Sequence, residues 1–465
     1  MPSFNLADQP WIPVYANGTT TTRSLGDVLN NAAHIDRIAT GNHLEDAAIQ
    51  HLLLAITLHS DGDTSTWLDD HRDQLDLFHP TQPFAQCAHL DVLGADTADA
   101  PDTLPYTFTT AHGSFNSYNT TSALPAGATL PTEDMARQLL VRQAFSVGGL
   151  LGPHTKKLGA PGRSANASTW TNHPSIWLHH QTLADSLAAM RDAATAANGP
   201  RGRFWFTTEE RPYSHQEHNA GILDTLTLPT RAIRLYPTSD GSGVHGVHFW
   251  EGHRMAPADP DTWRTTTWEK KTAKGPWQPR KSHQSRPAWR QLLEAATPDQ
   301  PGICNPAGLA PGATMSFTTL GSFQSRIDAI LHGTVPTPGI SADELAELAA
   351  LVGKGGSLGT RIYATHGRAA HYAANSTPWE DSAGGDPDPL AQRYATTIER
   401  RIGQVAMKRI AGTITHGQAV DGLNQVVQWV RQRHLADLGA ARPMAAAWLT
   451  SAYTYAQNKE QDNAQ

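Results

Sequence analysis

Basic and aromatic side chains gather in residues 263–290. Lysine and arginine neutralise phosphates and release their counterions, and aromatic rings stack on exposed bases. Only Glu269 opposes the positive charge here, so the stretch predicts contact with nucleic acid; a solvated charged face with structural tryptophans is the alternative. The basic residues are Arg264, Lys270, Lys271, Lys274, Arg280, Lys281, Arg286 and Arg290, and the tryptophans are Trp263, Trp268, Trp277 and Trp289.

A second candidate contact is the run Gly148-Gly149-Leu150-Leu151-Gly152, which precedes Lys156, Lys157 and Arg163. Because glycine lacks a side chain, its backbone can approach a ligand closely, as the narrow minor groove of DNA requires. The run therefore predicts a minor-groove contact. Gly148 also suits the C-terminal cap of a preceding helix, and the two roles are compatible.

Residues 363–369, Tyr-Ala-Thr-His-Gly-Arg-Ala, are typical of a turn between two short ordered segments. A protruding tip with the small and basic residues His366, Gly367 and Arg368 can wedge between stacked bases. An ordinary surface hairpin is the alternative.

The reactive side chains match no enzyme motif. Lys354-Gly355-Gly356-Ser357 lacks the spacing of a phosphate-binding loop, and His179-His180 is poorly placed to chelate a metal. Cys87 and Cys304 are too few for a disulfide framework or a multi-cysteine zinc site and are expected to be buried as small hydrophobic residues. We therefore expect a protein that is not an enzyme and needs no metal and no cofactor.

The composition is that of a large globular protein. With 465 residues, 39% of them hydrophobic, the chain can form a sizeable core and more than one domain. Its net charge of −7 argues against a general nucleic-acid coat, but allows a local basic groove, because salt screens charges beyond about 8–10 Å. No run approaches the ~18 apolar residues of a membrane helix, and no secretory signal is visible, so we expect a cytoplasmic protein.

Both helices and strands must position these residues. Apolar residues at helical spacing predict a helix over 44–58, and Thr132 is expected to cap a helix that runs to Phe145. The other expected elements are a strand over 4–14, a short helix starting at Ser24, strands over 203–208 and 224–252 with a turn at Asp240-Gly241-Ser242-Gly243, and loops over 95–131 and 150–175.

The pattern changes beyond Pro378. Residues 379–388 predict a linker, and helices are expected over 389–411, 416–434 and 441–457, with another near 341–352. Short connections between amphipathic helices favour antiparallel packing. We therefore expect a large mixed α/β (α+β) N-terminal domain over 1–378 and an antiparallel helical bundle over 389–465.

Several segments, in this order along nearly the whole chain, resemble those of CasA proteins, the large subunit of the type I-E CRISPR Cascade surveillance complex. They are Trp11-Ile12-Pro13-Val14, residues 78–86 (Phe-His-Pro-Thr-Gln-Pro-Phe-Ala-Gln), residues 142–149, residues 228–235, and Arg286-Pro287-Ala288-Trp289-Arg290. Each motif is weak alone, but their succession is fairly specific.

This resemblance implies a fold and a function. A CasA protein has a mixed α/β N-terminal domain and a C-terminal four-helix bundle, for which 341–352 is the expected fourth helix here. It sits beside the 5′ end of the guide RNA, among the backbone and small subunits of Cascade. It recognises the protospacer-adjacent motif in double-stranded target DNA, helps to unwind that duplex and docks the helicase-nuclease.

The resemblance also extends to nucleic-acid-binding residues, which carry over to matching positions. Those positions are Gly148 and Gly149 for the family's glycine loop, Ser114, Phe115 and Asn116 for the loop within 106–128 that senses the guide end and the motif, and Lys270 or Lys271, with Arg254 behind them, for the motif-reading lysine.

Two departures from the family's pattern bear on the site. The strand-separating wedge falls at 363–369, where His366, Gly367 and Arg368 stand and the glutamine of some members is absent. A steric role is expected for this turn, and its chemistry is open. The cysteine-rich zinc-ribbon insert of some relatives is also missing, which again predicts no metal.

Two other functions stay open: a hydrolase with unrecognised His and Asp residues on a mixed α/β scaffold, and a purely structural Cascade scaffold that never touches DNA. Turnover of DNA, RNA or ester substrates would indicate the first. Unchanged target binding after charge reversal of Lys270 and Lys271 would indicate the second.

Overall fold

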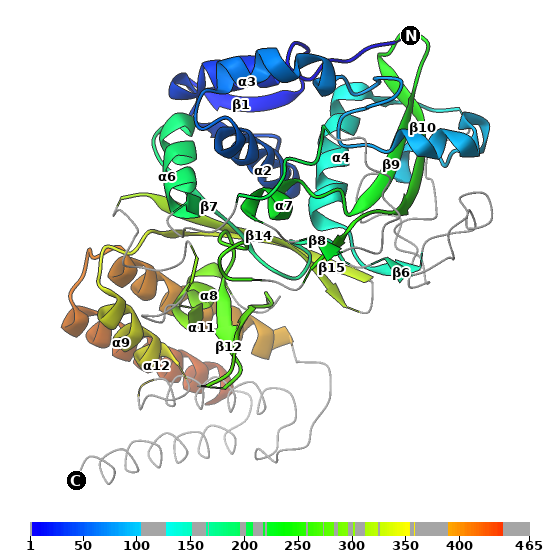
Figure 1. Cartoon of the computed structure of the whole chain (residues 1–465). Coiled ribbons are helices and arrows are strands. Elements are labelled where there is room, and N and C mark those ends of the chain that lie inside the picture. The colour runs from blue at the N-terminus through cyan, green and yellow to red at the C-terminus, as the bar shows by residue number, and fades with distance from the viewer. Residues whose placement is uncertain are drawn as a thin grey trace. The chain divides into compact units, whose positions relative to one another are not determined.

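A computed structural model describes most of the chain, and its residues pack into two compact units (Figure 1). Unit 1 comprises Met1–Ala288, Asp299–Cys304 and Ala313–Thr334, and unit 2 comprises Trp289–Pro298, Asn305–Gly312 and Val335–Gln465. The described residues are 2–103, 127–150, 164–165, 167–195, 201–207, 217–218, 221–256, 259–272, 274–282, 287–295, 301–302, 312–323, 326–353, 358 and 389–439.

The central helix of unit 1 is α2, His43–His59. The side chain of Asn42 caps its start by accepting a hydrogen bond from the amide of Leu44. Glu45 and Asp46 in the first turn are stabilised by the positive end of the helix dipole. Residues 47–58 are buried throughout, so α2 is a core helix rather than an amphipathic surface one. The predicted helix over 44–58 is confirmed, as is the short helix α1, Leu25–Asn30, which Ser24 caps.

Helix α4, Thr132–Phe145, packs beside α2 (Figure 1). Its predicted bounds are confirmed, but its predicted caps are wrong. The hydroxyl of Thr132 donates to the carbonyl of Gly241 at 2.8 Å, and Pro131 takes the N-cap position. At the other end Ser146 is the C-cap, and its hydroxyl donates to the carbonyl of Arg142 at 2.6 Å. Gly148 therefore does not end the helix.

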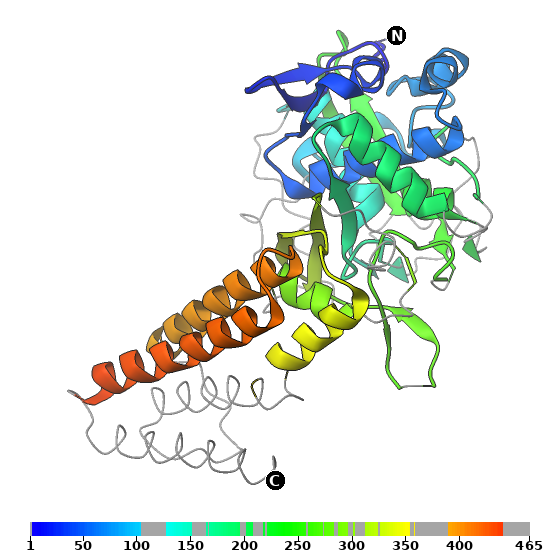
Figure 2. The ribbon, with the colours of Figure 1, turned by 90° about the vertical axis from the view of Figure 1, so that its left-hand side faces the viewer.

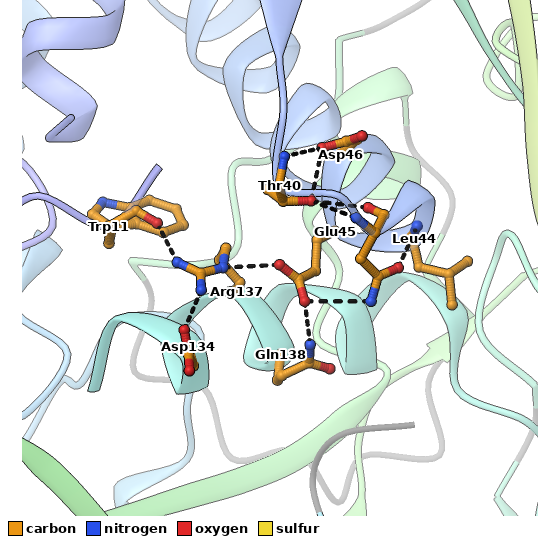
Figure 3. A network of polar contacts seen from close by, with 9 residues as sticks. Trp11, Thr40, Leu44, Glu45, Asp46, Asp134, Arg137 and Gln138 are labelled. Atoms are coloured by element: carbon orange, nitrogen blue, oxygen red, sulfur yellow. Dashed lines mark hydrogen bonds and ion pairs between the residues drawn. The ribbon is translucent and has the colours of Figure 1, made fainter. Parts of the chain in front are cut away.

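A buried network ties α2 to α4 (Figure 3). The guanidinium of Arg137 donates to Glu45 at 2.8 Å and to the carbonyl of Trp11 at 2.7 Å, and also contacts Asp134. Gln138 donates to the second oxygen of Glu45 at 2.6 Å. Burial raises the pKa of Glu45 although Arg137 acts to lower it. The network fixes the start of α2 against the first two turns of α4.

Strands β9, Arg231–Pro237, and β10, Gly243–Glu251, form an antiparallel hairpin that β4, Leu130–Pro131, extends. The predicted turn at 240–243 is confirmed: Asp240 accepts hydrogen bonds from the hydroxyl of Thr238 and the amide of Ser242. The predicted start of this strand region at residue 224 is wrong, because Ile222–Thr227 forms helix α7. There the buried carboxylate of Asp224 accepts from the amide of Gly221 and the indole of Trp205.

Two other strand predictions need correction. The strand expected over 4–14 begins only at β1, Ile12–Ala16, because the amides of Asp8 and Gln9 donate to the carbonyl of Asn5 in a turn. Residues 203–207 contain no strand, and the amide of Trp205 donates instead to the hydroxyl of Thr227 at 3.0 Å.

A three-stranded sheet in the order β15-β14-β7 lies beside α2 and joins distant parts of the sequence. It consists of β7, Ser175–His179, β14, Thr314–Phe323, and β15, Arg326–Pro336. The β14–β7 register pairs Thr314 with His179 and Thr318 with Ser175. Strands β14 and β15 were not expected from the sequence pattern.

The remaining elements of unit 1 are short. They are β2, Thr19–Arg23, and β3, Arg37–Ile38, which flank β1; α3, Thr64–His71; β5, Gly149–Leu150; β6, Ser164–Ala165; α6, Leu183–Thr195; β8, Glu217–His218; β11, Arg254–Met255; β12, Trp268–Lys270; and β13, Trp277–Pro279. Short 3-10 helices occur at Ala32–His34, Arg72–Leu75, Ala88–Leu93, Ala95–Thr97 and Pro101–Thr103. Where the structure describes them, the predicted loops over 95–131 and 150–175 therefore contain short elements.

Unit 2 is helical where the structure describes it. It contains α9, Ala342–Val352, α11, Pro389–Ile410, and α12, His416–Gly439, and most of α8, Ala288–Ala295. Helix α11 packs against the indole of Trp289 at Gly403, where a Cβ atom would lie 2.6 Å from the ring nitrogen. The buried Arg290 forms two hydrogen bonds with the carboxylate of Glu399, at 2.8 and 3.0 Å.

The helices expected over 341–352, 389–411 and 416–434 are thus confirmed, and α12 continues to Gly439. The helix expected over 441–457 and the linker 379–388 lie outside the described residues. Unit 2 includes residues well before 378, because α8 and α9 pack with α11. The mixed α/β class is confirmed. No helix within the described ranges could span a bilayer.

Candidate nucleic-acid interface

The basic stretch 263–290 contains a two-stranded hairpin made of β12 and β13, which extends from unit 1 (Figure 2). Lys270 lies opposite Trp277 in the register, and its ammonium nitrogen is 4.6 Å from the centre of the indole ring. Lys271 and Lys274 follow in the connecting turn with exposed side chains. The hairpin therefore presents cationic side chains and one half-buried aromatic face together.

The other tryptophans of the stretch serve the core. Trp268 is 1% exposed and donates to the carbonyl of Trp263, which is itself buried, and Trp289 is buried in unit 2. Trp263, Trp268 and Trp289 are therefore structural tryptophans, the alternative that the sequence left open. Only Trp277 is placed where a base could stack on it.

The positive charge is also more localised than the sequence suggests. Arg264 donates to the carbonyl of Ala193 at 2.9 Å, and partial burial lowers the pKa of its guanidinium. Arg280 lies 3.8 Å from Glu269, and Arg290 pairs with Glu399. Four exposed cations of the stretch form no ion pair within the described parts of the chain. They are Lys270, Lys271, Lys274 and Lys281.

The base of the hairpin is held by residues 168–175, which we call the anchor segment. The amide of Ser282 donates to the carbonyl of Asn172 at 2.8 Å, and the hydroxyl of Thr266 donates to the carbonyl of Pro174 at 2.8 Å. Asn172 itself has a φ of 67°, in the left-handed region that asparagine tolerates better than most residues. These hydrogen bonds therefore fix both ends of the hairpin to unit 1.

The same anchor segment holds the end of α4, which leads to the glycine run. The amide of Ser168 donates to the carbonyl of Ser146 at 2.7 Å, and that of Trp170 to the carbonyl of Ala144 at 3.1 Å. One short segment therefore links two of the three regions that the sequence singled out. This role was not expected from the sequence, although Asn172 and Pro174 are typical of a turn.

Gly149 lies in β5 and pairs with Ala165 of β6. Lys156 and Lys157 fall between these two strands in the sequence and lie outside the described residues. The carbonyl of Val147 accepts from the buried guanidinium of Arg231 at 2.8 Å, which fixes the entry to the run. Hydrogen bonds with Arg231 and Ala165 accordingly fix the backbone around Gly148 and Gly149.

Arg254 is less suited to DNA contact than Lys270 or Lys271. Its guanidinium forms two hydrogen bonds with one oxygen of Glu251, at 3.0 and 2.7 Å, and both side chains are mostly buried. A phosphate would have to compete with this carboxylate. The other predicted contacts lie outside the described residues and stay predictions. They are Ser114, Phe115, Asn116, Lys156, Lys157, His366, Gly367 and Arg368.

Within the ranges that the structure describes, no three His, Cys, Asp or Glu side chains form a cluster able to hold a metal. Cys87 is half-buried rather than fully buried and packs against a core cluster that includes Leu90. Burial raises the pKa of its thiol to about 11, so that it stays protonated at neutral pH. Cys304 lies outside the described residues. The absence of a metal and of a cofactor stays a prediction.

A family model, that of the CRISPR-associated protein Cse1, matches residues 5–436. The chain belongs to the CRISPR-associated Cse1 family. The resemblance to CasA proteins, the other name of this family in its relatives, is thereby confirmed.

Relatives of the Cse1 family agree with this assignment. The CRISPR-associated protein CasA/Cse1 of Thermus thermophilus is 33% identical over 169 residues, which is 32% of this chain and 32% of the relative. That aligned region therefore spans about a third of the relative's length.

Solved structures match over almost the whole chain. The crystal structure of Thermus thermophilus CasA has a TM-score of 0.71 at 21% identity, with 98% of this chain and 99% of the other covered. Thermobifida fusca Cse1 has a TM-score of 0.70 at 21% identity, covering 98% and 97%. A chain of a CRISPR RNA-guided surveillance complex has a TM-score of 0.73 at 18% identity, covering 98% and 100%. These likenesses show that the fold is shared.

Proposed function

We propose that this Cse1 protein is the non-catalytic large subunit of a type I-E Cascade complex in the cytoplasm. In this role it recognises the protospacer-adjacent motif in double-stranded target DNA. Base pairing with the guide RNA would then read the remaining sequence, a division of labour known for RNA-guided systems. Membership of the Cse1 family and the fold shared with a chain of an RNA-guided surveillance complex support this assignment.

The observation that carries the proposal is that a single segment, residues 168–175, holds both candidate DNA contacts in place. The hairpin with Lys270 and Lys271 and the α4 end before Gly148 both hydrogen-bond to the anchor segment. Lysine side chains would neutralise phosphates while a bare backbone enters the minor groove. Readout from that groove is degenerate, so we expect tolerance of several related motifs.

The remaining parts of the role concern opening of the duplex and partner binding. His366, Gly367 and Arg368 would wedge between base pairs beside the motif, and unstacking costs a few kcal/mol per step. Ser114, Phe115 and Asn116 would lie near the 5′ end of the guide RNA. The backbone and small subunits would hold the chain in the complex, and the helicase-nuclease would dock on it once the strands have separated.

We propose further that unit 2 is a four-helix bundle. Helices α9, α11 and α12 would supply three of its members, and residues 441–457 the fourth. The packing of α11 against both α9 and α12 supports this arrangement.

The direct test compares Cascade assembled with and without this chain in a gel-shift assay. The target duplexes carry one matched sequence and differ only in the adjacent motif. We expect the complete complex to prefer some motifs by at least tenfold, and the complex without the chain to bind all duplexes equally weakly. Equal motif preference in both complexes would refute the proposal.

A further inference from the structure

Unit 1 contains a cavity of about 700 Å³ that shares no lining residue with the hairpin or the glycine run. Its volume is within the range of about 300–1,000 Å³ that is typical of small-molecule sites. One wall is a face of the β15-β14-β7 sheet, where Thr314, Ser316 and Thr318 alternate along β14. The start of α2 and strand β3 form the opposite side.

Gln50 of α2 is the unusual member of this cavity. Its side chain is only 6% exposed, and it lines the cavity with a polar amide. Because Gln50 lines the cavity, a ligand there could both donate to and accept from it.

The imidazoles that line the cavity offer flat surfaces. His43 and His332 stack with ring centres 3.6 Å apart and planes 8° from parallel. His332 shares a 2.9 Å hydrogen bond with the hydroxyl of Thr318, and His179 shares one of 2.9 Å with Ser316. Burial lowers the pKa of His179 to about 4, and partial burial does the same for His332. Both rings are therefore neutral near pH 7.

The charges at the cavity do not suit a bare polyanion. The cavity lining includes two acidic residues, Asp36 and Asp46, and one basic residue, Arg37. The exposed guanidinium of Arg37 lies 4.2 Å from the ring centre of Tyr15. Burial raises the pKa of Asp46, which accepts two hydrogen bonds from Thr40. A ligand that fits is neutral and flat in the interior, and carries any anionic group near Arg37 at the rim.

We propose that this cavity binds a single unstacked nucleobase. Its polar edge would pair with Gln50 and the hydroxyls of β14, and one face would lie against His43. The few apolar lining residues, Ile38, Ala39 and Ala47, offer no deep pocket for a hydrophobic anchor of a partner protein. Binding of a base in this cavity would not depend on the hairpin or on recognition of the protospacer-adjacent motif.

The test measures binding of the four nucleosides and their 5′-monophosphates to the isolated full-length chain by calorimetry or ligand-observed NMR. We expect at least one base to bind, and Gln50→Leu and His43→Ala each to weaken it by tenfold or more. Gln50→Leu should unfold at about the same temperature as wild type, because leucine has a volume similar to that of glutamine. Gln425→Leu, at an exposed glutamine of α12, is the matched control and should change nothing.

Competition by a short single-stranded oligonucleotide would identify a strand as the source of the base, whereas binding of free nucleosides without such competition would identify a soluble nucleotide. Absence of binding by every nucleoside, or binding that neither variant weakens, overturns the proposal. Protection of the cavity by another Cascade subunit, without nucleoside binding, also overturns it in favour of a protein contact. Motif preference of assembled Cascade is measured separately, so failure of one proposal leaves the other standing.

Discussion

Replacement of Lys270 and Lys271 by glutamate is expected to weaken binding of assembled Cascade to its target duplex by at least tenfold near physiological salt. Each lysine that neutralises a phosphate releases counterions, so its removal lowers both the affinity and the salt dependence. If each of the two lysines neutralises one phosphate, the slope of log K against log salt should become shallower by about 2 in the variant. The measurement is a salt titration of duplex binding by fluorescence anisotropy.

The control for this experiment is the pair Lys270→Arg and Lys271→Arg, which keeps the positive charge and should retain most of the affinity. Both side chains are exposed at the hairpin, so neither change should affect folding or assembly, which size-exclusion chromatography verifies. If the glutamate variant assembled normally and still bound the duplex as wild type does, the chain would be a scaffold rather than a DNA reader.

Acid is expected to destabilise unit 1 through histidines that fold in the neutral form. Burial lowers the pKa of His51 to about 3, and of His173 and His179 to about 4, against about 6.5 in an unfolded chain. Below pH 6.5 the unfolded state binds protons that the folded state excludes, so stability falls as the pH falls. At pH 5.5 the loss is about 1.4 kcal/mol per histidine, or about 4 kcal/mol for three.

Urea denaturation at pH 7.5 and 5.5 measures this loss, and His51→Gln identifies its source. The imidazole of His51 lies 2.6 Å from the hydroxyl of Ser175, a contact that the amide of glutamine can imitate without titrating. The variant should lose about 1.4 kcal/mol less than wild type between the two pH values. His34→Gln, at an exposed side chain, should lose as much as wild type. Equal losses in wild type and His51→Gln would contradict the explanation.

Elements with strong local signals could be predicted from the sequence. Helix α2 has a capping asparagine and an apolar run, and the β9–β10 turn has Asp240 and Gly241 at its centre. Local signals fail where a distant group decides the structure. The segment at Asp224 reads as a strand, but its carboxylate is satisfied by Gly221 and Trp205, and a helix results.

The candidate interface shows the same limit. Composition located the basic hairpin, but it could not separate Trp277, at the surface, from Trp268, in the core. It also counted Arg290 as a free cation, although Glu399 pairs with it from 109 residues away. The Gln50 cavity was invisible because β7, β14 and α2 meet only in the folded chain.

Site-specific photo-crosslinking tests the central claim most directly. A photoreactive residue at position 271 of the hairpin, in assembled Cascade, is irradiated with a duplex that carries the preferred motif, and the crosslinked nucleotides are mapped. The same residue at Val92, an exposed side chain of unit 1, reports background. We predict crosslinks from position 271 to the motif and the base pairs beside it. The account would be contradicted if complexes that bind the duplex gave no more crosslinks to the motif from position 271 than from position 92.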